Sequence, residues 1–248
     1  VNDSDIKVTS EYLTEVTAPL ADSSVGLVTC LYRAEAHTLA AAWEALGIAT
    51  EFMPSTLVAQ ALGVREFGLG STLVFRAEDL AQAGGFTALG DYLADDYQLA
   101  KRITELGKRA LLSTYTVETS LGDTFWSGSW QHQLRWARTI RFSKASGYAG
   151  LPITHAGVWI AAAIALGKYE LGLLLLALRL VSALLSASPV LSSRLATRLF
   201  WLAPLRDLYS FAIWLTSYAG RKVRWGDRIL IIDNKGRITD VRPADGLN

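Results

Sequence analysis

The pattern of apolar and polar positions changes near residue 150 of this 248-residue chain. Before that point, three short runs rich in β-branched and apolar residues are typical of strands: 25–32, 71–76 and 110–118. Three stretches with helical spacing accompany them: 36–51, 77–83 and 93–106. We expect these helices to end at glycines, near Gly47, at Gly84-Gly85 and at Gly107. Strands that alternate with helices predict an α/β layer over residues 1–150.

From about residue 152 the chain is strongly apolar, with segments at 157–166, 171–191 and 200–220. A membrane-spanning helix needs about 20 residues, so the first segment is short unless it begins near residue 151. Three spans are the preferred count, and two are the alternative. Ahead of this block, residues 126–143 combine helical spacing with aromatic and arginine side chains, which is typical of an interfacial helix.

The pattern divides the chain into three predicted parts. Residues 1–150 form the α/β part and include the interfacial helix, and residues 151–220 form a membrane region of two or three helices. Residues 221–248 form a C-terminal cytoplasmic tail, in which Asn234-Lys235-Gly236 between apolar runs predicts a hairpin.

Basic clusters flank the apolar block. One precedes it, at Arg135, Arg138, Arg141 and Lys144, and one follows it, at Arg221, Lys222, Arg224 and Arg228. Three crossings would place the clusters on opposite sides of a membrane, which the positive-inside rule disfavours. The charge pattern and the count of three spans therefore disagree, unless one segment lies in the interface or re-enters the membrane.

Composition excludes several classes of protein. The net charge of +1 lacks the general basic field that nucleic-acid binders carry, so we expect no nucleic-acid partner. The single cysteine, Cys30, excludes an intramolecular disulfide and any multi-cysteine zinc site. Because the chain begins with Val1 and its one methionine is Met53, we expect it to be the C-terminal part of a longer protein.

Two acidic motifs are candidates for chemistry. Asp3 and Asp5 are two residues apart in a polar turn, and carboxylates so placed can share Mg²⁺ or Mn²⁺ with substrate phosphates, although such pairs are also common in surface turns. Asp95 and Asp96 open the helix at 93–106, where acidic side chains often only cap the free amides. In a partly dry site, one of them could instead act as a general base.

A third candidate lies in the interfacial helix, within Gln131-His132-Gln133-Leu134-Arg135-Trp136. The spacing of His132, Arg135 and Trp136 predicts that they share one helical face. Arg135 could pair with diphosphate oxygens through its planar fork of donors. Trp136 could stack on a ring or anchor the helix at a membrane interface, and His132 could be a ligand or a structural hydrogen-bond donor.

Taken in order, these motifs resemble a known family. Val1-Asn2-Asp3-Ser4-Asp5, Ala94-Asp95-Asp96-Tyr97 and Gln133-Leu134-Arg135-Trp136, followed by apolar segments, are similar to the lipid-directed glycosyltransferases of families 2 and 21, especially the ceramide glucosyltransferase group. The stretch from His132 to Thr139 is similar to bacterial members associated with hopanoid biosynthesis. Two departures stand out: the family's first aspartate motif would lie upstream of Val1, and His132 occupies a position where the family has Gln or Arg.

The resemblance implies a GT-A-like α/β domain followed by transmembrane helices, and an inverting transfer of a sugar from a UDP-sugar to a lipid hydroxyl. It implies that Asp3 and Asp5 hold Mg²⁺ or Mn²⁺ and that Asp96 acts as the base with Asp95 tuning its pKa. It further implies that Arg135, Trp136, His132 and Gln131 bind substrate. The expected location is a membrane, with several spans and a cytoplasmic catalytic face, which in a bacterium means the inner membrane.

Several alternatives stay open at this stage. The sugar could be glucose or N-acetylglucosamine, and the acceptor a ceramide-like lipid, a hopanoid or a diacylglycerol. A polysaccharide synthase would share the chemistry but usually has more spans. A non-catalytic membrane scaffold would use the acidic residues only as surface caps, and it predicts that replacing Asp96 by Asn changes nothing.

Overall fold

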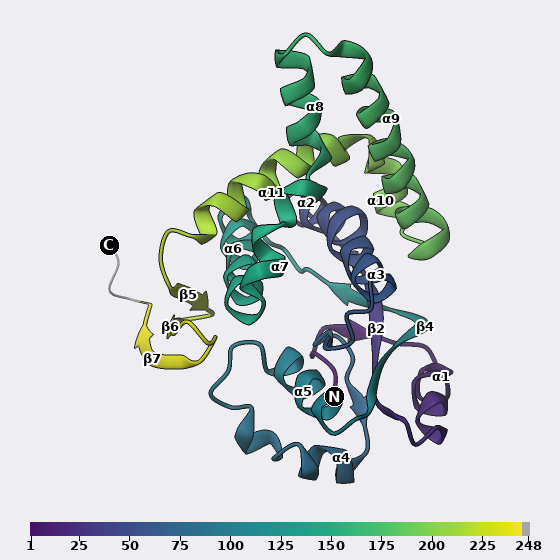
Figure 1. Ribbon diagram of the computed structural model, residues 1–248, viewed down its shortest axis with the longest axis vertical. Helices are drawn as coiled ribbons and strands as arrows, with labels where there is room; N and C mark the ends of the chain where they lie inside the picture. The colour runs from purple at the N-terminus through teal and green to yellow at the C-terminus, as the bar shows by residue number, and fades with distance from the viewer. Residues whose placement is uncertain (245–248) are drawn as a thin grey trace.

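The computed structural model describes residues 1–244 and contains two β-sheets (Figure 1). The strands of the first sheet have the order β1-β4-β2-β3: β1 (Ile6–Lys7), β2 (Val25–Glu35), β3 (Val74–Phe75) and β4 (Arg109–Ser120). The strands of the second have the order β5-β6-β7: β5 (Lys222–Trp225), β6 (Arg228–Ile232) and β7 (Ile238–Pro243). The predicted α/β class is confirmed.

The first sheet is built on two long parallel strands, β2 and β4, which pair from Val25 opposite Arg109 to Glu35 opposite Ser120. The short strands β1 and β3 pair antiparallel at its edges. Apolar side chains of this sheet form one core with α1 (Tyr12–Thr17) and α2 (Leu39–Gly47), and another with α5 (Asp95–Glu105). The short helix α4 (Ala77–Gln82) and α5 each end two residues before a glycine with positive φ, Gly84 and Gly107, as predicted.

One predicted helix end is wrong. The helical chain does not stop at Gly47 but continues through a π-helical turn, η2 (Ile48–Phe52), into α3 (Met53–Ala61). A Cβ atom at Gly47 would lie 2.4 Å from Nη2 of Arg206, a residue of α11 (Ala203–Ser217). Gly47 therefore serves close packing between two helices rather than helix termination.

The predicted interfacial helix is α6 (Trp126–Ser143), which is followed by α7 (Ala145–Ala149). The segment predicted as a third span forms α11, which packs against α6, α8 and α2. Ala137, Tyr148 and Ile213 form a buried cluster in this region. Two charged residues of α11, Arg206 and Asp207, are buried as well. In the structure α11 is thus part of the folded body.

Two helices project from that body at the top of Figure 1: α8 (Ala156–Ala165) and α9 (Tyr169–Leu185). After α9 the chain runs through η5 (Ser186–Val190) into α10 (Arg194–Leu199). Leucines along α9 are exposed, among them Leu173 at 66% and Leu178 at 58%. Within residues 1–244, one helix, Tyr169–Val190, is long and apolar enough to cross a membrane. The structure therefore does not show the three expected spans.

The two basic clusters lie side by side. Arg138 on α6 donates hydrogen bonds to the carbonyl oxygens of Lys222 and Ala219, and Arg141 donates to the carbonyl of Gly220. The start and the end of the apolar block are therefore held together. The two clusters, which three crossings would place on opposite sides of a membrane, are thus in contact in the structure.

The C-terminal sheet also contacts the loop before α5. Gly236 accepts a hydrogen bond from the N–H of Leu93, and the N–H of Ile238 donates to the carbonyl of Asp91. Gly236 has φ of 77° in the predicted turn between β6 and β7, so the hairpin is confirmed. The sheet links α6 to the segment that carries Asp95 and Asp96.

Candidate active site

Two acidic residues open α5, where the first peptide N–H groups have no partners within the helix. Asp95 accepts the Asp96 N–H through Oδ1 at 2.9 Å, and Asp96 accepts the Tyr97 N–H through its own Oδ1 at 2.7 Å. The other oxygen of Asp96, Oδ2, accepts the N–H of Gly70 at 3.0 Å. Both carboxylates thus stabilise the start of the helix, and Asp96 also reaches the loop before β3.

Asp3 approaches Asp96 across a glycine. A Cβ atom at Gly70 would lie 3.4 Å from Oδ2 of Asp96 and 3.6 Å from Oδ2 of Asp3. The missing side chain leaves a space that both carboxylates face. Gly68 allows a second close approach, since a Cβ atom there would lie 2.9 Å from the carbonyl oxygen of Asp96. The fold therefore brings the first and second acidic motifs together.

This environment changes the acidity of both groups. Burial raises the pKa of Asp96 to about 6; hydrogen bonds from Tyr97 and Gly70 oppose the rise, and the charges of Asp95 and Asp3 add to it. Burial, together with the charges of Asp5 and Asp95, also raises the pKa of Asp3, and Arg135 opposes that rise. A carboxyl group with a pKa close to the working pH can take up a proton during a reaction and release it afterwards.

The metal expectation meets a limited donor set. Asp5 accepts a hydrogen bond from Oγ1 of Thr119 at 2.8 Å, and residues 1–244 contain no group of three or more His, Cys, Asp or Glu side chains that could hold a metal ion. Mg²⁺, however, is often held by one or two carboxylates plus substrate phosphates and water. Asp3 and Asp5 fit that role, because their carboxylate oxygens are the hard donors that such an ion prefers. A divalent cation would also offset the negative charges of Asp5 and Asp95, which raise the pKa of Asp3.

A polar pocket of about 520 Å³ lies between α6 and the β5–β6 turn. Gln131, His132 and Arg135 line it from α6, and Arg224 and Trp225 line it from the C-terminal sheet. The guanidinium of Arg135 stacks 4.6 Å from the centroid of the Trp225 ring. Burial lowers the pKa of Arg135, while the charges of Glu44 and Asp3 oppose that change. The pocket thus offers two guanidinium groups, which suit an anionic ligand.

Residues 1–238 match the sequence model of the family described as Glycosyl transferase family 21. The chain belongs to this family. A glycosyltransferase acts on a sugar donor and an acceptor, and this one presents paired carboxylates at Gly70 and a basic pocket on α6.

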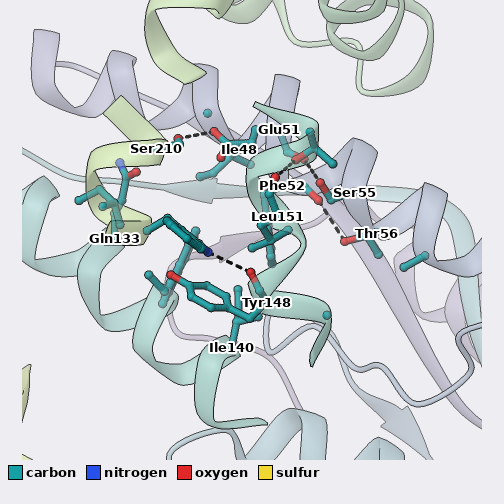
Figure 2. A pocket seen from close by; sticks show the side chains of 18 of the residues that line it. Ile48, Glu51, Phe52, Ser55, Thr56, Gln133, Ile140, Tyr148, Leu151 and Ser210 are labelled. Carbon is teal, nitrogen blue, oxygen red and sulfur yellow. Dashed lines mark hydrogen bonds between the residues drawn. The ribbon is translucent and has the colours of Figure 1, made fainter. Parts of the chain in front are cut away.

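This family 21 glycosyltransferase also contains a mostly apolar cavity of about 430 Å³, part of which is drawn in Figure 2. Trp136 lines it, and its ring lies 5.5 Å from that of Phe52 and 4.6 Å from that of His132. The prediction that His132, Arg135 and Trp136 share one face is therefore only partly right. His132 and Arg135 line the polar pocket, whereas Trp136 lines the apolar cavity.

Sequence reasoning missed Glu44, which is only 2% exposed on α2. Its carboxylate accepts the Ser129 hydroxyl at 2.7 Å and lies 2.5 Å from Nδ1 of His132. Glu44 therefore orients the imidazole at the edge of the polar pocket. The sequence offers one sign of such a residue: Glu44 is the only acid in the alanine-rich, apolar run of α2. A carboxylate buried there needs hydrogen-bond partners from elsewhere in the fold.

Proposed function

We propose that this glycosyltransferase moves a hexosyl group, glucose or N-acetylglucosamine, from a UDP-sugar to a hydroxyl of a membrane lipid. The position of Asp96 is the observation that carries the proposal. Its carboxylate is held by the Gly70 and Tyr97 amides beside Asp3, and it has a pKa of about 6. A ceramide-like lipid and a hopanoid are the acceptors that the sequence resemblance favours.

In the proposed reaction, Asp96 accepts the proton of the acceptor hydroxyl as the hydroxyl oxygen attacks the anomeric carbon. The bond between that carbon and the diphosphate oxygen breaks, its electron pair leaves with UDP, and the configuration inverts. Asp95, whose charge helps to raise the pKa of Asp96, tunes the base. A single displacement of this kind needs no covalent enzyme intermediate.

The donor would bind with its diphosphate toward α6. Arg135 would donate hydrogen bonds to diphosphate oxygens, and Gln131 and His132 border the same pocket. Asp3 and Asp5 would hold Mg²⁺ or Mn²⁺, which supplies positive charge against the leaving diphosphate when it is bound. Trp136, on the adjacent cavity, would shape the entrance for the acceptor.

The exposed leucines of α9 support contact with a bilayer. We propose that α8 and α9 enter the membrane while the carboxylates and the basic pocket stay on the cytoplasmic side, where UDP-sugars occur. In a bacterium this side belongs to the inner membrane.

UDP release by the purified full-length protein in detergent tests the proposal, with a panel of UDP-sugars and lipid acceptors beside the Asp96→Asn variant. We expect release that depends on the acceptor and disappears in the variant. A folded, metal-supplied protein that releases no UDP with any pair from the panel would contradict the proposed substrates.

A further inference from the structure

The apolar cavity is lined by a few polar side chains whose presence packing alone does not explain. It lies between the continuous helix of α2, η2 and α3 on one side and α6, α7 and α11 on the other. Apolar side chains such as Phe52, Ile140 and Leu151 dominate its lining (Figure 2). Cavities of this size and composition commonly bind a largely apolar ligand, and a few polar groups of the protein fix the orientation of that ligand.

His155, at the start of α8, is such a polar group. It is only 3% exposed and lines the cavity, and its Nδ1 atom is buried without a hydrogen-bond partner among residues 1–244. The nearest carboxylate oxygen, Oε1 of Glu51, lies 3.6 Å away, which is too far for a hydrogen bond. Buried nitrogens are rarely left in this state, because an unmade hydrogen bond costs free energy.

Glu51 is fixed from its other side. Its Oε2 atom accepts the Ser210 hydroxyl at 2.6 Å and lies 3.8 Å from Nη1 of Arg206 (Figure 2 shows the bond from Ser210). Oε1 is therefore held facing His155 in a π-helical turn, a local geometry that often occurs at functional sites. A group placed between the two could hydrogen-bond both: it would donate to Glu51 and pair with the imidazole nitrogen.

The cavity also comes close in the chain to the candidate carboxylates. Leu69 lines it, and the next residue, Gly70, donates its N–H to Asp96. Trp136 lines it too, and follows Arg135 of the polar pocket directly in the chain. The cavity therefore ends one residue away from Gly70 and one residue away from Arg135.

We propose that this cavity binds the apolar body of the acceptor lipid, and that His155 and Glu51 bind a second polar group of that lipid, a hydroxyl or a secondary amide. This group is distinct from the hydroxyl that receives the sugar. The inference rests on the proposed function. It makes His155 and Glu51 specificity-determining residues that select amphiphiles with an additional hydrogen-bonding group.

Two variants of the full-length protein test the two halves of the proposal. Ala59→Phe places a ring in the cavity from α3, and His155→Leu replaces the imidazole by an apolar side chain. His37→Leu, at an exposed histidine outside the cavity, is the matched control. The readouts are KM for acceptor, KM for UDP-sugar, and retention of the lipid in detergent by native mass spectrometry. Each is measured with a pair of acceptors that differ only in the second polar group.

We expect Ala59→Phe to raise acceptor KM and reduce lipid retention about tenfold, with KM for the UDP-sugar unchanged. We expect the unaltered protein and His37→Leu to prefer the acceptor with the second polar group by about tenfold, and His155→Leu to lose that preference. Unchanged acceptor KM and retention in Ala59→Phe would overturn the cavity assignment, and an unchanged preference in His155→Leu would overturn the role of His155.

The same measurements separate this inference from the proposed function. Lipid that is retained by the protein and displaced by Ala59→Phe, without any sugar transfer, supports the cavity and contradicts the transfer reaction. Transfer that proceeds normally in both variants supports the reaction and contradicts the cavity. If only water lies between His155 and Glu51, every variant should bind the two acceptors with equal affinity. This outcome would overturn the proposed contact with a second polar group of the lipid.

Discussion

Asp96 serves both the fold and the proposed chemistry. Its two oxygens accept peptide N–H groups from Tyr97 and Gly70, which orient it, while burial raises its pKa to about 6. The raised pKa means that the folded protein binds this proton more tightly than the unfolded chain does. Ionisation of Asp96 therefore costs folding free energy, and that cost grows as the pH rises from about 4 to 6.

Asp96→Asn should separate the two roles. The amide keeps an oxygen acceptor but cannot take a proton, so we expect turnover to fall by about 10²- to 10⁴-fold. Removing the buried charge would raise the free energy of unfolding at pH 7 by up to about 3 kcal/mol. The amide has one acceptor oxygen, however, so either the Gly70 or the Tyr97 N–H loses its partner, at a cost of about 1–3 kcal/mol. We therefore expect a net change in stability of less than about 2 kcal/mol. UDP release and urea denaturation measure the two effects. A loss of UDP release that is fully explained by the fraction of unfolded variant would show that Asp96 acts only in folding.

The pH dependence of kcat/KM provides a second test. A base with a pKa of about 6 is protonated below that pH, so kcat/KM should fall about tenfold for each pH unit below 6 and level off above it. The measurement is a set of initial rates from pH 4.5 to 8 in buffers of constant ionic strength. A flat profile down to pH 5 would contradict the assignment of Asp96 as the base.

At the residue scale, the sequence pointed to the acids and Arg135 because their motifs occur in an order that resembles a known family, although each motif alone also has a structural explanation. They did not identify Gly70 or Glu44 as site residues. Gly70 matters through the space it leaves between Asp3 and Asp96, and Glu44 through contacts with Ser129 and His132 on another helix. Both depend on tertiary neighbours that no local pattern specifies.

At the element scale, the loop before β3 sets the distance between the two acidic motifs. A Cβ atom at Gly68 would lie 2.9 Å from the Asp96 carbonyl oxygen, whereas one at Gly70 would meet its nearest neighbour, Oδ2 of Asp96, at 3.4 Å. The first contact requires the backbone to move, and the second is close to ordinary van der Waals contact. The same substitution should therefore act differently at the two positions.

Gly68→Ala should lower the free energy of unfolding by about 1–3 kcal/mol, because the methyl group overpacks α5. Gly70→Ala should change it by less than about 1 kcal/mol but reduce turnover about ten- to hundredfold, since the methyl group enters the space between the carboxylates. Thermal unfolding and UDP release measure both. Full activity in a folded Gly70→Ala variant would show that no substrate uses that space.

The β5–β6 turn contributes one wall of the polar pocket. Trp225→Ala removes the ring that stacks on Arg135, so we expect KM for the donor to rise about two- to fivefold with kcat nearly unchanged. Trp201→Ala, at a tryptophan that is 59% exposed and does not line the pocket, is the control. An unchanged donor KM in Trp225→Ala would mean that Arg135 holds its position without the C-terminal sheet.

At the scale of the whole molecule, hydrophobic periodicity predicted the α/β sheet and α6 well, since both follow local rules. The structure does not show the span predicted for 200–220: α11 packs on α6, and Tyr169–Val190 is the helix within residues 1–244 that is long and apolar enough to cross a membrane. The deciding feature is the buried charge on α11: Asp207 pairs with Arg179 of α9, and Arg206 donates to Ser210. Charges satisfied inside the protein cannot be distinguished by composition from charges at a membrane surface.

The contacts of Arg138 and Arg141 with residues 219–222 constrain how the chain can cross a membrane. Under the proposed membrane attachment, an odd number of crossings between α6 and β5 would separate these partners by a bilayer, so we expect both segments to face the same side. Single cysteines at Ser146 and Asp227, two exposed positions outside the apolar block, can report this after Cys30, which is buried, is replaced by serine. In sealed, oriented vesicles, we expect a membrane-impermeant maleimide to label both positions from the same side. Labelling from opposite sides would mean that the chain crosses the membrane an odd number of times and that α6 and β5 do not pack as described.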